Sequence, residues 1–359
     1  MDCHSCCFIQ RIYNDFIFET FVTKLGGFYM FIKILKEKEM TQLFSMREAI
    51  DADKKALELY SNGKATIPLR TNIDVEEYEG QNLYMSGLAG DAAGVKIVSV
   101  YPNNIAKGLT SVPASMILLN EETGEISSIM DGTFLTQLRT GAISGAATEL
   151  LSREDSRVFA LFGTGGQAES QLEAVLTVRN IQEVYVMDLD YDRATDFAEK
   201  MTEKFGEEFG VRIQAVKDAK EAVENADVIT TVTTAPRPVF DMDHVKSGAH
   251  INGVGSYTPK MQEIPGELFA KAGKIFLDTR DGVLNESGDL INPMEDVLIT
   301  EKDISGELGE LISGSISGRE NNEEITIFKT TGSAVLDLVV AKEIYKKAVE
   351  QDVGMDIEI

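Results

Sequence analysis

The sequence predicts an α/β protein in which a doubly wound parallel sheet domain is joined to a smaller α+β domain. The chain has 359 residues, enough for two domains of about 150 residues that each bury their own core. From Arg157 onward apolar strands alternate with helices of about 10–13 residues, which is typical of a parallel sheet covered on both faces. Between residues 68 and 119, short β-type runs broken by Gly and Asn instead indicate an antiparallel or mixed sheet.

The composition excludes several classes of protein. Hydrophobic residues make up 43% of the chain and charged residues 26%, as in ordinary globular proteins and unlike disordered or fibrous ones. With 59 acidic and 34 basic side chains the formal net charge is −25, and a field of that sign repels phosphate backbones and anionic lipids. No run reaches the roughly 18 apolar residues of a membrane span. We therefore expect neither nucleic acid nor a membrane as a partner.

Residues 1–29 are expected to be a disordered extension or the product of a misassigned start site, because Met30 begins a more regular segment. The cysteines of the chain all lie in this stretch: Cys3, Cys6 and Cys7. The remainder can form no disulfide, which favours a reducing, cytoplasmic location. These cysteines and His4 resemble part of a soft metal site, but no second Cys/His cluster completes it, so no metal is expected. Asp15 and Glu19 interrupt the apolar run and argue against a signal peptide.

The predicted first domain, residues 30–150, begins with a helix and continues into the sheet. Ser45 and Glu48 form a capping box, apolar residues follow at helical spacing, and Gly63 ends the helix. Strands of this sheet are predicted at Val95–Val100 and Met116–Leu119. A long helix over about 133–151 is rich in Gly, Ala and Ser, which allow close backbone approach. We expect this helix to connect the two domains.

The predicted second domain, residues 151–325, repeats strand, turn and helix. Its strands are predicted at Val158–Phe162, Val184–Met187, Val211–Val216, Val228–Thr231 and Ile275–Asp278. Its helices are predicted at Gln167–Val178, Arg193–Phe205 and Ala219–Asn225. A strand at Ile325–Phe328 then leads into a final helix, Ser333–Glu350. The segment 326–359 is expected to return to the first domain.

A glycine-rich turn, Gly163-Thr-Gly-Gly-Gln-Ala168, follows the first strand of this domain and opens a helix. Its first Gly makes a tight turn, its second lets a pyrophosphate approach the backbone, and the small Ala168 permits close packing of the helix. Asp188 ends the next strand, 20 residues after Ala168, where a carboxylate accepts adenosine ribose hydroxyls; Asp190 is a nearby substitute. The pattern predicts a dinucleotide site, and NAD rather than NADP, since Asp188 would repel a 2′-phosphate.

Three cations of the first domain are candidates for binding an anion: Arg70, Lys96 and Arg139. Lys96 lies in the apolar strand Gly94-Val-Lys-Ile-Val98, where burial is costly unless an anion or a catalytic step needs the charge. An ion pair or a solvated face explains each of these residues equally well. Spacing alone does not decide between these interpretations.

Five motifs occur in the order known from one family: residues 94–104, 135–142, 163–168, 250–255, and 328–332 with Asp337. On these motifs the chain, from about residue 40 to 350, resembles the ornithine cyclodeaminase/mu-crystallin family. That family includes archaeal alanine dehydrogenases and cyclic ketimine reductases. The resemblance implies a homodimer in which a substrate-binding and dimerisation domain lies beside a Rossmann-type NAD-binding domain. It also implies hydride exchange at the α-carbon of a small amino or imino acid.

The resemblance further implies a role for each matching residue. Arg70, Lys96 and Arg139 match residues that hold the substrate carboxylate. Lys96 is also placed for proton transfer, and Ser111 stands where true ornithine cyclodeaminases have Thr. The implied cofactor contacts are Thr140, Gly163, Thr164, Gly165, Gly166, Gln167, Ala168, Asp188, Thr233, Val254, Gly255, Lys329 and Gly332.

One motif departs from the family pattern. True ornithine cyclodeaminases carry Val-Gly-Gly-Asp, whose Asp handles the distal amine, whereas this chain reads Val254-Gly-Ser-Tyr257. A phenol, with a pKa of about 10, is neither a ready base nor a counter-ion for ammonium. We therefore favour an imino-acid reductase or amino-acid dehydrogenase in which Tyr257 serves catalysis as a donor to an imine, although a packed loop aromatic fits equally well. The alternatives are ornithine cyclodeamination to proline and ammonia, and a non-enzymatic NAD-dependent binding protein.

Overall fold

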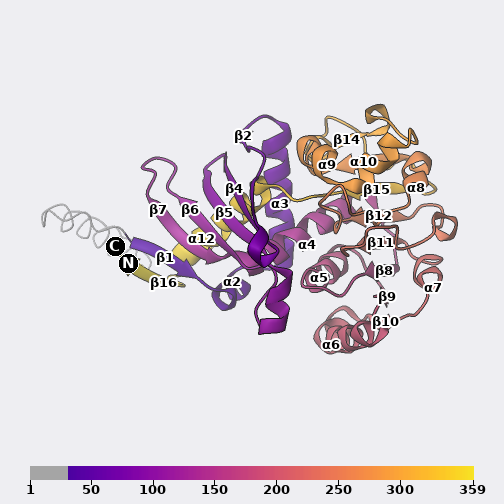
Figure 1. Ribbon diagram of the computed structural model, residues 1–359, viewed down its shortest axis with the longest axis horizontal. Coiled ribbons are helices and arrows are strands. Elements are labelled where there is room, and N and C mark those ends of the chain that lie inside the picture. Colours follow the sequence, from indigo (N-terminus) through magenta and orange to yellow (C-terminus); the bar gives the residue numbers. More distant parts are fainter. Residues whose placement is uncertain (1–30) are drawn as a thin grey trace, which may run out of the picture.

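The computed structural model describes residues 31–359, so the expectations for residues 1–29 and for the cysteines lie outside the described residues. Two eight-stranded sheets lie side by side, and helices α3 (Met46–Ser61) and α4 (Gly132–Leu151) run between them (Figure 1). The α/β fold class is therefore confirmed. No helix within residues 31–359 is both long and apolar enough to cross a membrane.

The first sheet is mixed. Its strands are β1 (Phe31–Leu35), β2 (Ala65–Thr66), β3 (Thr71–Val75), β4 (Gly80–Ala89), β5 (Ala92–Val100), β6 (Ala114–Leu119), β7 (Ile126–Asp131) and β16 (Met355–Glu358). They lie in the order β16-β1-β7-β6-β5-β4-β2, with β3 also on β4. β1 and β7 pair in parallel and the other neighbours pair antiparallel. No pattern in the sequence predicted β16, the last strand of the chain, which pairs with β1.

Four helices accompany this sheet: α2 (Glu37–Leu43), α3, α4 and α12 (Ala334–Glu350), with the short 3-10 turns η1 (Glu76–Tyr78) and η2 (Pro102–Lys107) in its loops. Side chains of α3, α4 and α12 share one apolar core with the inner face of the strands. The predicted capping box is present, because the Ser45 amide donates to Glu48 Oε2 at 3.0 Å and the Glu48 amide donates to Ser45 Oγ at 3.4 Å. The small residues of α4 also act as predicted. A β-carbon on Gly141 would strike the Ser170 carbonyl of the second domain.

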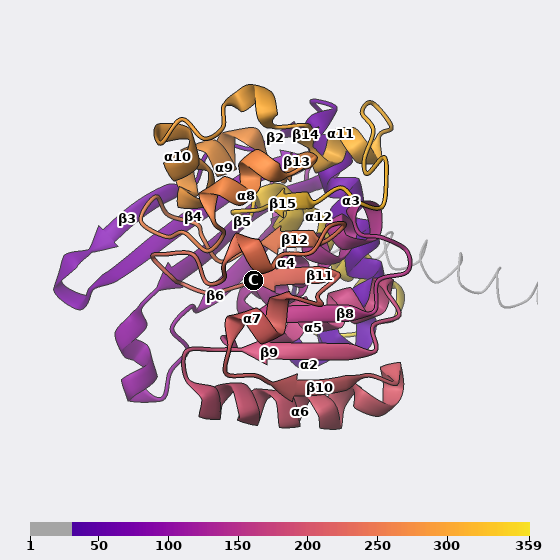
Figure 2. The ribbon, with the colours of Figure 1, turned by 90° about the vertical axis from the view of Figure 1, so that its right-hand side faces the viewer.

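The second sheet is parallel throughout (Figure 2). Its strands are β8 (Val158–Phe162), β9 (Glu183–Met187), β10 (Arg212–Ala215), β11 (Val228–Thr231), β12 (His250–Gly253), β13 (Lys274–Leu277), β14 (Gly306–Glu307) and β15 (Thr326–Lys329). The order β10-β9-β8-β11-β12-β15-β13-β14 begins with the 3-2-1-4-5 arrangement of dinucleotide-binding sheets, and β15, the last of these strands in the sequence, lies between β12 and β13. The predicted strand Ile325–Phe328 is thus β15, inside this sheet, and the chain crosses from it to α12 and the first sheet.

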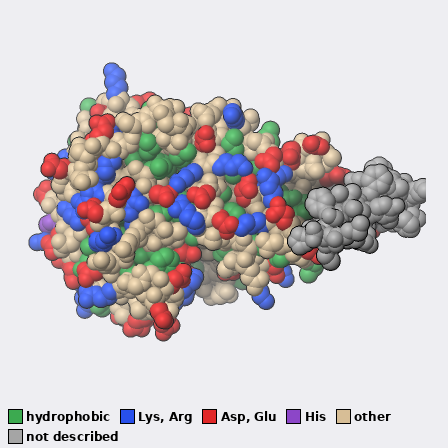
Figure 3. Space-filling view, turned by 180° about the vertical axis from the view of Figure 1, so that it is seen from behind, with side chains coloured by type: hydrophobic (Ala, Val, Ile, Leu, Met, Phe, Trp, Pro, Cys, Tyr) green, Lys and Arg blue, Asp and Glu red, His purple; other side chains and the backbone are tan. Residues whose placement is uncertain are grey.

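The helices of the second half pack against this sheet and complete its core. They are α5 (Ala168–Val178), α6 (Tyr191–Phe209), α7 (Ala219–Val223), α8 (Gly266–Lys271), α9 (Arg280–Glu286) and α10 (Gly288–Glu295), with 3-10 turns η3 (Met242–His244) and η4 (Glu301–Asp303). α11 (Leu308–Ile312) instead packs against α3 and belongs to the core of the first sheet. On the face of the molecule shown in Figure 3, cationic and acidic side chains alternate rather than gathering by sign.

Candidate active site

Two of the predicted cations meet at one carboxylate between the sheets. Lys96 Nζ of β5 lies 2.7 Å from Asp337 Oδ2, and Arg139 Nε of α4 lies 2.9 Å from Asp337 Oδ1. Asp337 belongs to the first turn of α12, where the helix dipole favours an anion. All three side chains are buried. While Lys96 is protonated, two cations against one anion leave this cluster with an excess positive charge, which suits the binding of a further carboxylate.

The fold explains why Lys96 is buried. Lys96 pairs across the sheet with Met85 of β4 and Met116 of β6, and both methionines lie in apolar cores under the sheet. Burial lowers the pKa of Lys96 to about 7, although the facing carboxylate of Asp337 opposes the shift. An amine that titrates near neutral pH can both donate and accept a proton, as acid–base catalysis requires.

A further carboxyl, Asp53 of α3, lies close to this cluster. It is fully buried, and neither of its oxygens has a hydrogen-bond partner among the described residues. Burial raises the pKa of Asp53 well above its usual range, and the negative charge of Asp337 adds to the shift although Arg139 opposes it. Burial thus disfavours the charged form of Asp53, which weakens its ability to cancel the excess positive charge.

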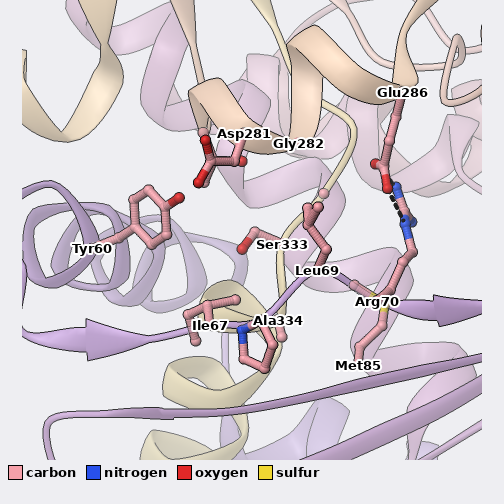
Figure 4. A pocket seen from close by; sticks show the side chains of 13 residues that line it. Tyr60, Ile67, Leu69, Arg70, Met85, Asp281, Gly282, Glu286, Ser333 and Ala334 are labelled. Carbon is pink, nitrogen blue, oxygen red and sulfur yellow. Dashed lines mark hydrogen bonds and ion pairs between the residues drawn. The ribbon is translucent and has the colours of Figure 1, made fainter.

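Arg70, the third predicted cation, is paired across the gap between the two sheets. Its Nε donates to Glu286 Oε1 of α9 at 2.8 Å, a second guanidinium nitrogen contacts the other carboxylate oxygen, and the same nitrogen lies 3.4 Å from the Thr331 carbonyl. The pair borders a cavity of about 280 Å³. Figure 4 shows Arg70 and Glu286 facing each other at one side of this cavity and Tyr60 on the other.

The cluster and the cavity adjoin the carboxyl edge of the second sheet. Gly332 lines the cavity, has a φ of +77°, and a β-carbon on it would lie 2.7 Å from a guanidinium nitrogen of Arg139. Asp278, at the end of β13, fixes this segment by accepting hydrogen bonds from the Thr330 hydroxyl at 2.5 Å and the Gly332 amide at 2.9 Å. The predicted cations of the first sheet thus lie beside the edge where parallel sheets bind dinucleotides.

The glycine-rich turn has the expected geometry. Gly163 has a φ of +98°, and a β-carbon on Gly165 would meet nothing within 4 Å, so the turn is open above its second glycine. Asp188 Oδ2 accepts hydrogen bonds from the Thr164 amide at 3.0 Å and hydroxyl at 2.6 Å. Burial would raise the pKa of Asp188, but these hydrogen bonds hold it below its usual range, so the carboxylate is charged. Asp188 therefore fixes the turn itself as well as lying where a ribose would bind.

The other predicted cofactor contacts fall into two groups. Thr140 Oγ and Gln167 Oε1 are buried atoms without a hydrogen-bond partner among the described residues, and are available to a ligand. Thr233, Val254 and Gly255 lie in the loops that follow β11 and β12. Lys329, in contrast, is fully buried, and its Nζ lies 3.1 Å from Asp289 Oδ2. It therefore pairs with a carboxylate of its own domain.

Ser111 and Tyr257 complete the predicted set. Ser111 lies in the loop before β6, where its carbonyl accepts a hydrogen bond from the Tyr101 amide at 2.8 Å. Tyr257 is half-buried in the loop after β12. Burial raises the pKa of Tyr257 while the positive charge of Arg70 opposes the shift, so the phenol stays neutral. This protonation state excludes Tyr257 as a base and leaves it as a donor.

Sequence reasoning missed four carboxyl groups near these residues: Asp53, Glu263, Glu286 and Asp337. Asp337 occurs in a matching motif, but no local feature indicated that it would join Lys96 to Arg139. No signal in the sequence singled out the other three. In the part of the chain that the structure describes, no three His, Cys, Asp or Glu side chains form a group that could hold a metal ion.

Comparison with known proteins identifies the family. The model of the ornithine cyclodeaminase/mu-crystallin family matches residues 32–352. The chain belongs to this family. A Δ1-pyrroline-2-carboxylate reductase of Bacillus cereus is 39% identical over 327 residues, which are 90% of this chain and 99% of the relative.

Solved structures of relatives have the same fold. Δ1-Pyrroline-2-carboxylate reductase of Thermococcus litoralis, in complex with NADH and L-proline, matches with a TM-score of 0.86 and 43% identity, over 91% of this chain and 100% of that chain. A dimeric archaeal alanine dehydrogenase with bound NAD matches with a TM-score of 0.84 and 37% identity, over 91% and 99% of the two chains. The sequence-based assignment to the family, with its two-sheet architecture, is thereby confirmed.

Proposed function

We propose that this chain is an NAD-dependent reductase of a small cyclic imino acid, with Δ1-pyrroline-2-carboxylate as the first substrate to test. The observation that carries the proposal is the buried Lys96–Asp337–Arg139 cluster, whose excess positive charge lies beside the carboxyl edge of a dinucleotide-type sheet. Its relatives in Bacillus cereus and Thermococcus litoralis are reductases of this imino acid.

The side chains divide the work by their chemistry. Arg139 presents a planar guanidinium that suits a carboxylate and binds that of the substrate, and Arg70 provides a second guanidinium at the rim of the cavity. Lys96, with a pKa of about 7, supplies the proton that the imine nitrogen gains on reduction. Asp337 holds Lys96 and Arg139 in place. Tyr257 is a candidate for a hydrogen bond to the imine.

The described residues fit a bound NAD. The turn after β8 is open above Gly165, and the Thr140 and Gln167 oxygens are free to bind a ligand. The charged Asp188 favours ribose hydroxyls over a 2′-phosphate, and hence NAD over NADP. Bound NADH would supply the hydride. Loops after β8, β11 and β12 would hold the cofactor at the edge that faces Arg139 and Gly332.

Oxidative and redox-neutral variants of the reaction are the competing functions. Ornithine cyclodeamination needs a group for the distal ammonium, and the neutral Tyr257 supplies no counter-charge. Amino-acid dehydrogenation is the same reaction in reverse, and the related archaeal alanine dehydrogenase supports it. The proposal includes a homodimer, as in that structure, and a division into a substrate-binding part (30–150) and an NAD-binding part that starts at residue 151. The chain returns to the first sheet after β15 and not at residue 326, where the sequence predicted the boundary, because β15 pairs with β12 and β13. A cytoplasmic location stays a prediction.

One assay separates these functions. Purified enzyme is incubated with pyrroline-2-carboxylate and NADH, and in parallel with ornithine and catalytic NAD, while NADH and ammonia are measured. The proposal predicts stoichiometric loss of NADH in the first reaction and no ammonia in the second. Ammonia without net NADH would instead establish cyclodeamination. Cofactor binding without turnover on a panel of amino and imino acids would leave a binding protein.

A further inference from the structure

A buried carboxylate that the proposed reaction does not use lies at the carboxyl edge of the second sheet. Glu263, in the loop between β12 and α8, is fully buried. Its Oε1 accepts hydrogen bonds from the Thr233 amide at 2.6 Å and the Thr233 hydroxyl at 2.8 Å. Its Oε2 accepts from the Gly255 amide at 2.6 Å and the Ser256 amide at 2.9 Å. One side chain thus joins the loop after β11 to the loop after β12.

These two loops belong to one half of the dinucleotide site. In the strand order of the sheet, β9 and β10 lie on one side of β8 and form the adenosine half, with Asp188. β11 and β12 lie on the other side, where the nicotinamide nucleotide binds. Thr233 also contacts the phosphate-binding turn, because a β-carbon on Gly163 would lie 3.0 Å from Thr233 Cγ2. Thr233 therefore links Glu263 to the phosphate-binding turn.

Neighbouring groups hold Glu263 in this place. Its own amide donates to Asp289 Oδ1 at 2.7 Å, and Asp289 in turn pairs with the buried Lys329. Gly255 leaves room for the side chain, since a β-carbon there would lie 2.6 Å from Glu263 Oε1. Gly255 and Lys329, two of the predicted cofactor contacts, thus help to hold the loops in place. Because the Glu263 carboxylate is itself fixed, the loops after β11 and β12 are held in a single conformation.

We propose that Glu263 is a positioning residue that sets the shape of the nicotinamide half of the cofactor site, an inference that rests on the proposed NAD-dependent function. The Glu263 oxygens act as acceptors for four donors, of which the Gly255 amide also donates to the Thr231 carbonyl at 3.2 Å. In a Glu263→Gln variant the amide would direct N–H groups at one pair of these donors. The loop on that side would move away, while Asp188 and the adenosine half would stay as they are.

The test compares two ligands and two variants. NADH binding is measured by fluorescence titration, and AMP, which occupies only the adenosine half, is measured by its competition with NADH. For Glu263→Gln we expect the Kd for NADH to rise at least about tenfold, as for the loss of a hydrogen bond to a charged group, with the Ki for AMP within about twofold of wild type. Glu263→Asp keeps the charge but shortens the reach, and we expect a rise of about threefold for NADH alone.

Asp227 provides the matched control. It is also a buried carboxylate, and it accepts the Arg157 and Val158 amides at 2.7 and 2.9 Å, but at the opposite, amino edge of the same sheet. Asp227→Asn should lower the melting temperature without changing the Kd for NADH. The inference is overturned if folded Glu263→Gln or Glu263→Asp binds NADH like wild type, or if NADH and AMP weaken equally. Wild-type protein that binds no NADH would instead overturn the proposed function.

Discussion

Two buried charge clusters in this molecule have opposite compositions. In the first, between the sheets, the cations Lys96 and Arg139 share the carboxylate of Asp337. In the second, at the edge of the parallel sheet, the cation Lys329 pairs with Asp289, which also accepts the amide of Glu263, so that two carboxyl groups lie near one cation. Both trios are almost entirely removed from solvent. An unbalanced charge at such a depth is costly unless something else compensates it.

The groups that compensate the charge differ between the two clusters, and this difference distinguishes a cluster that supports the fold from one that can react with a substrate. In the second cluster, burial and the charge of Asp289 raise the pKa of Glu263, and Lys329 and hydrogen bonds from Thr233 oppose that shift. The oxygens of Glu263 accept backbone amides and a hydroxyl, which are fixed dipoles that leave nothing for a ligand. The excess positive charge of the first has no such compensation, because burial disfavours the charged form of the nearby Asp53. A substrate carboxylate can supply the missing charge. The following changes test whether the first cluster is the reactive one.

Replacement of Lys96 should have the largest effect. Lys96→Met keeps the length of the side chain but removes the proton, and general acid catalysis contributes about 10²–10⁴-fold, so we expect kcat/KM for the imino acid to fall by about a thousandfold. Lys33→Met is the matched control. Lys33 is also buried in the first sheet, but it pairs with Asp356 of β16 at 2.9 Å. A Lys96→Met variant within about threefold of wild type would exclude proton transfer by this residue.

Removing the anion of the first cluster should cost mainly stability. In Asp337→Asn two buried cations lose their shared partner, and we expect the free energy of unfolding to fall by about 3 kcal/mol in urea denaturation. Asp53→Asn, an equally conservative change at a neighbouring carboxyl, should stay within about 1 kcal/mol because burial already disfavours the charged form of that group. Equal losses in both variants would mean that Asp53 is ionised and that the cluster carries no excess charge.

The pH dependence should reveal the same cluster. Burial brings the pKa of Lys96 down to about 7 from its ordinary value of 10.5, so the ammonium loses its proton as the pH rises through neutrality. Reduction needs the protonated amine, and its kcat/KM should fall about tenfold per pH unit above this pKa. Oxidation of the amino acid needs the neutral amine and should rise up to the same pH. A profile of reduction that is flat from pH 6 to about 9 in wild type would contradict the assignment.

Much of the fold could be predicted because the information is local. Val158–Phe162 and Val228–Thr231 are strands with the predicted bounds, since strands buried on both faces read as unbroken apolar runs between turns. β16 could not be predicted in this way, because its four residues are exposed and only its pairing with β1 makes it a strand. A cation in an apolar strand is likewise a local anomaly, and so Lys96 could be identified from the sequence.

The partners of the cations were beyond local reasoning. Asp337 lies 198 positions from Arg139, and Glu286 lies 216 positions from Arg70, so tertiary packing alone selects them. Family resemblance placed Lys329 among the cofactor contacts, but the residue that uses its charge, Asp289, is visible only in the folded chain. Sequence therefore identified which charges matter, and the structure showed whether each is free or already paired.

The smallest predicted effect concerns Arg70, which has a carboxylate partner of its own, Glu286, whereas Lys96 and Arg139 share one. Glu286 binds the Arg70 guanidinium with both carboxylate oxygens and thus competes with a substrate carboxylate for it. Glu286→Gln keeps the shape of the side chain but removes its charge, and we expect the KM for the imino acid to fall about threefold with kcat unchanged, the scale of a partly exposed ion pair.

Asp281→Asn makes the same change of charge in the same cavity, at an exposed carboxylate that is not paired with Arg70, and should leave KM unaltered. If both variants lower KM equally, the cavity responds to total charge rather than to the release of Arg70. If Glu286→Gln raises KM, the carboxylate is needed to aim the guanidinium at the substrate. In that case the positive excess available to the substrate resides in Lys96 and Arg139 alone.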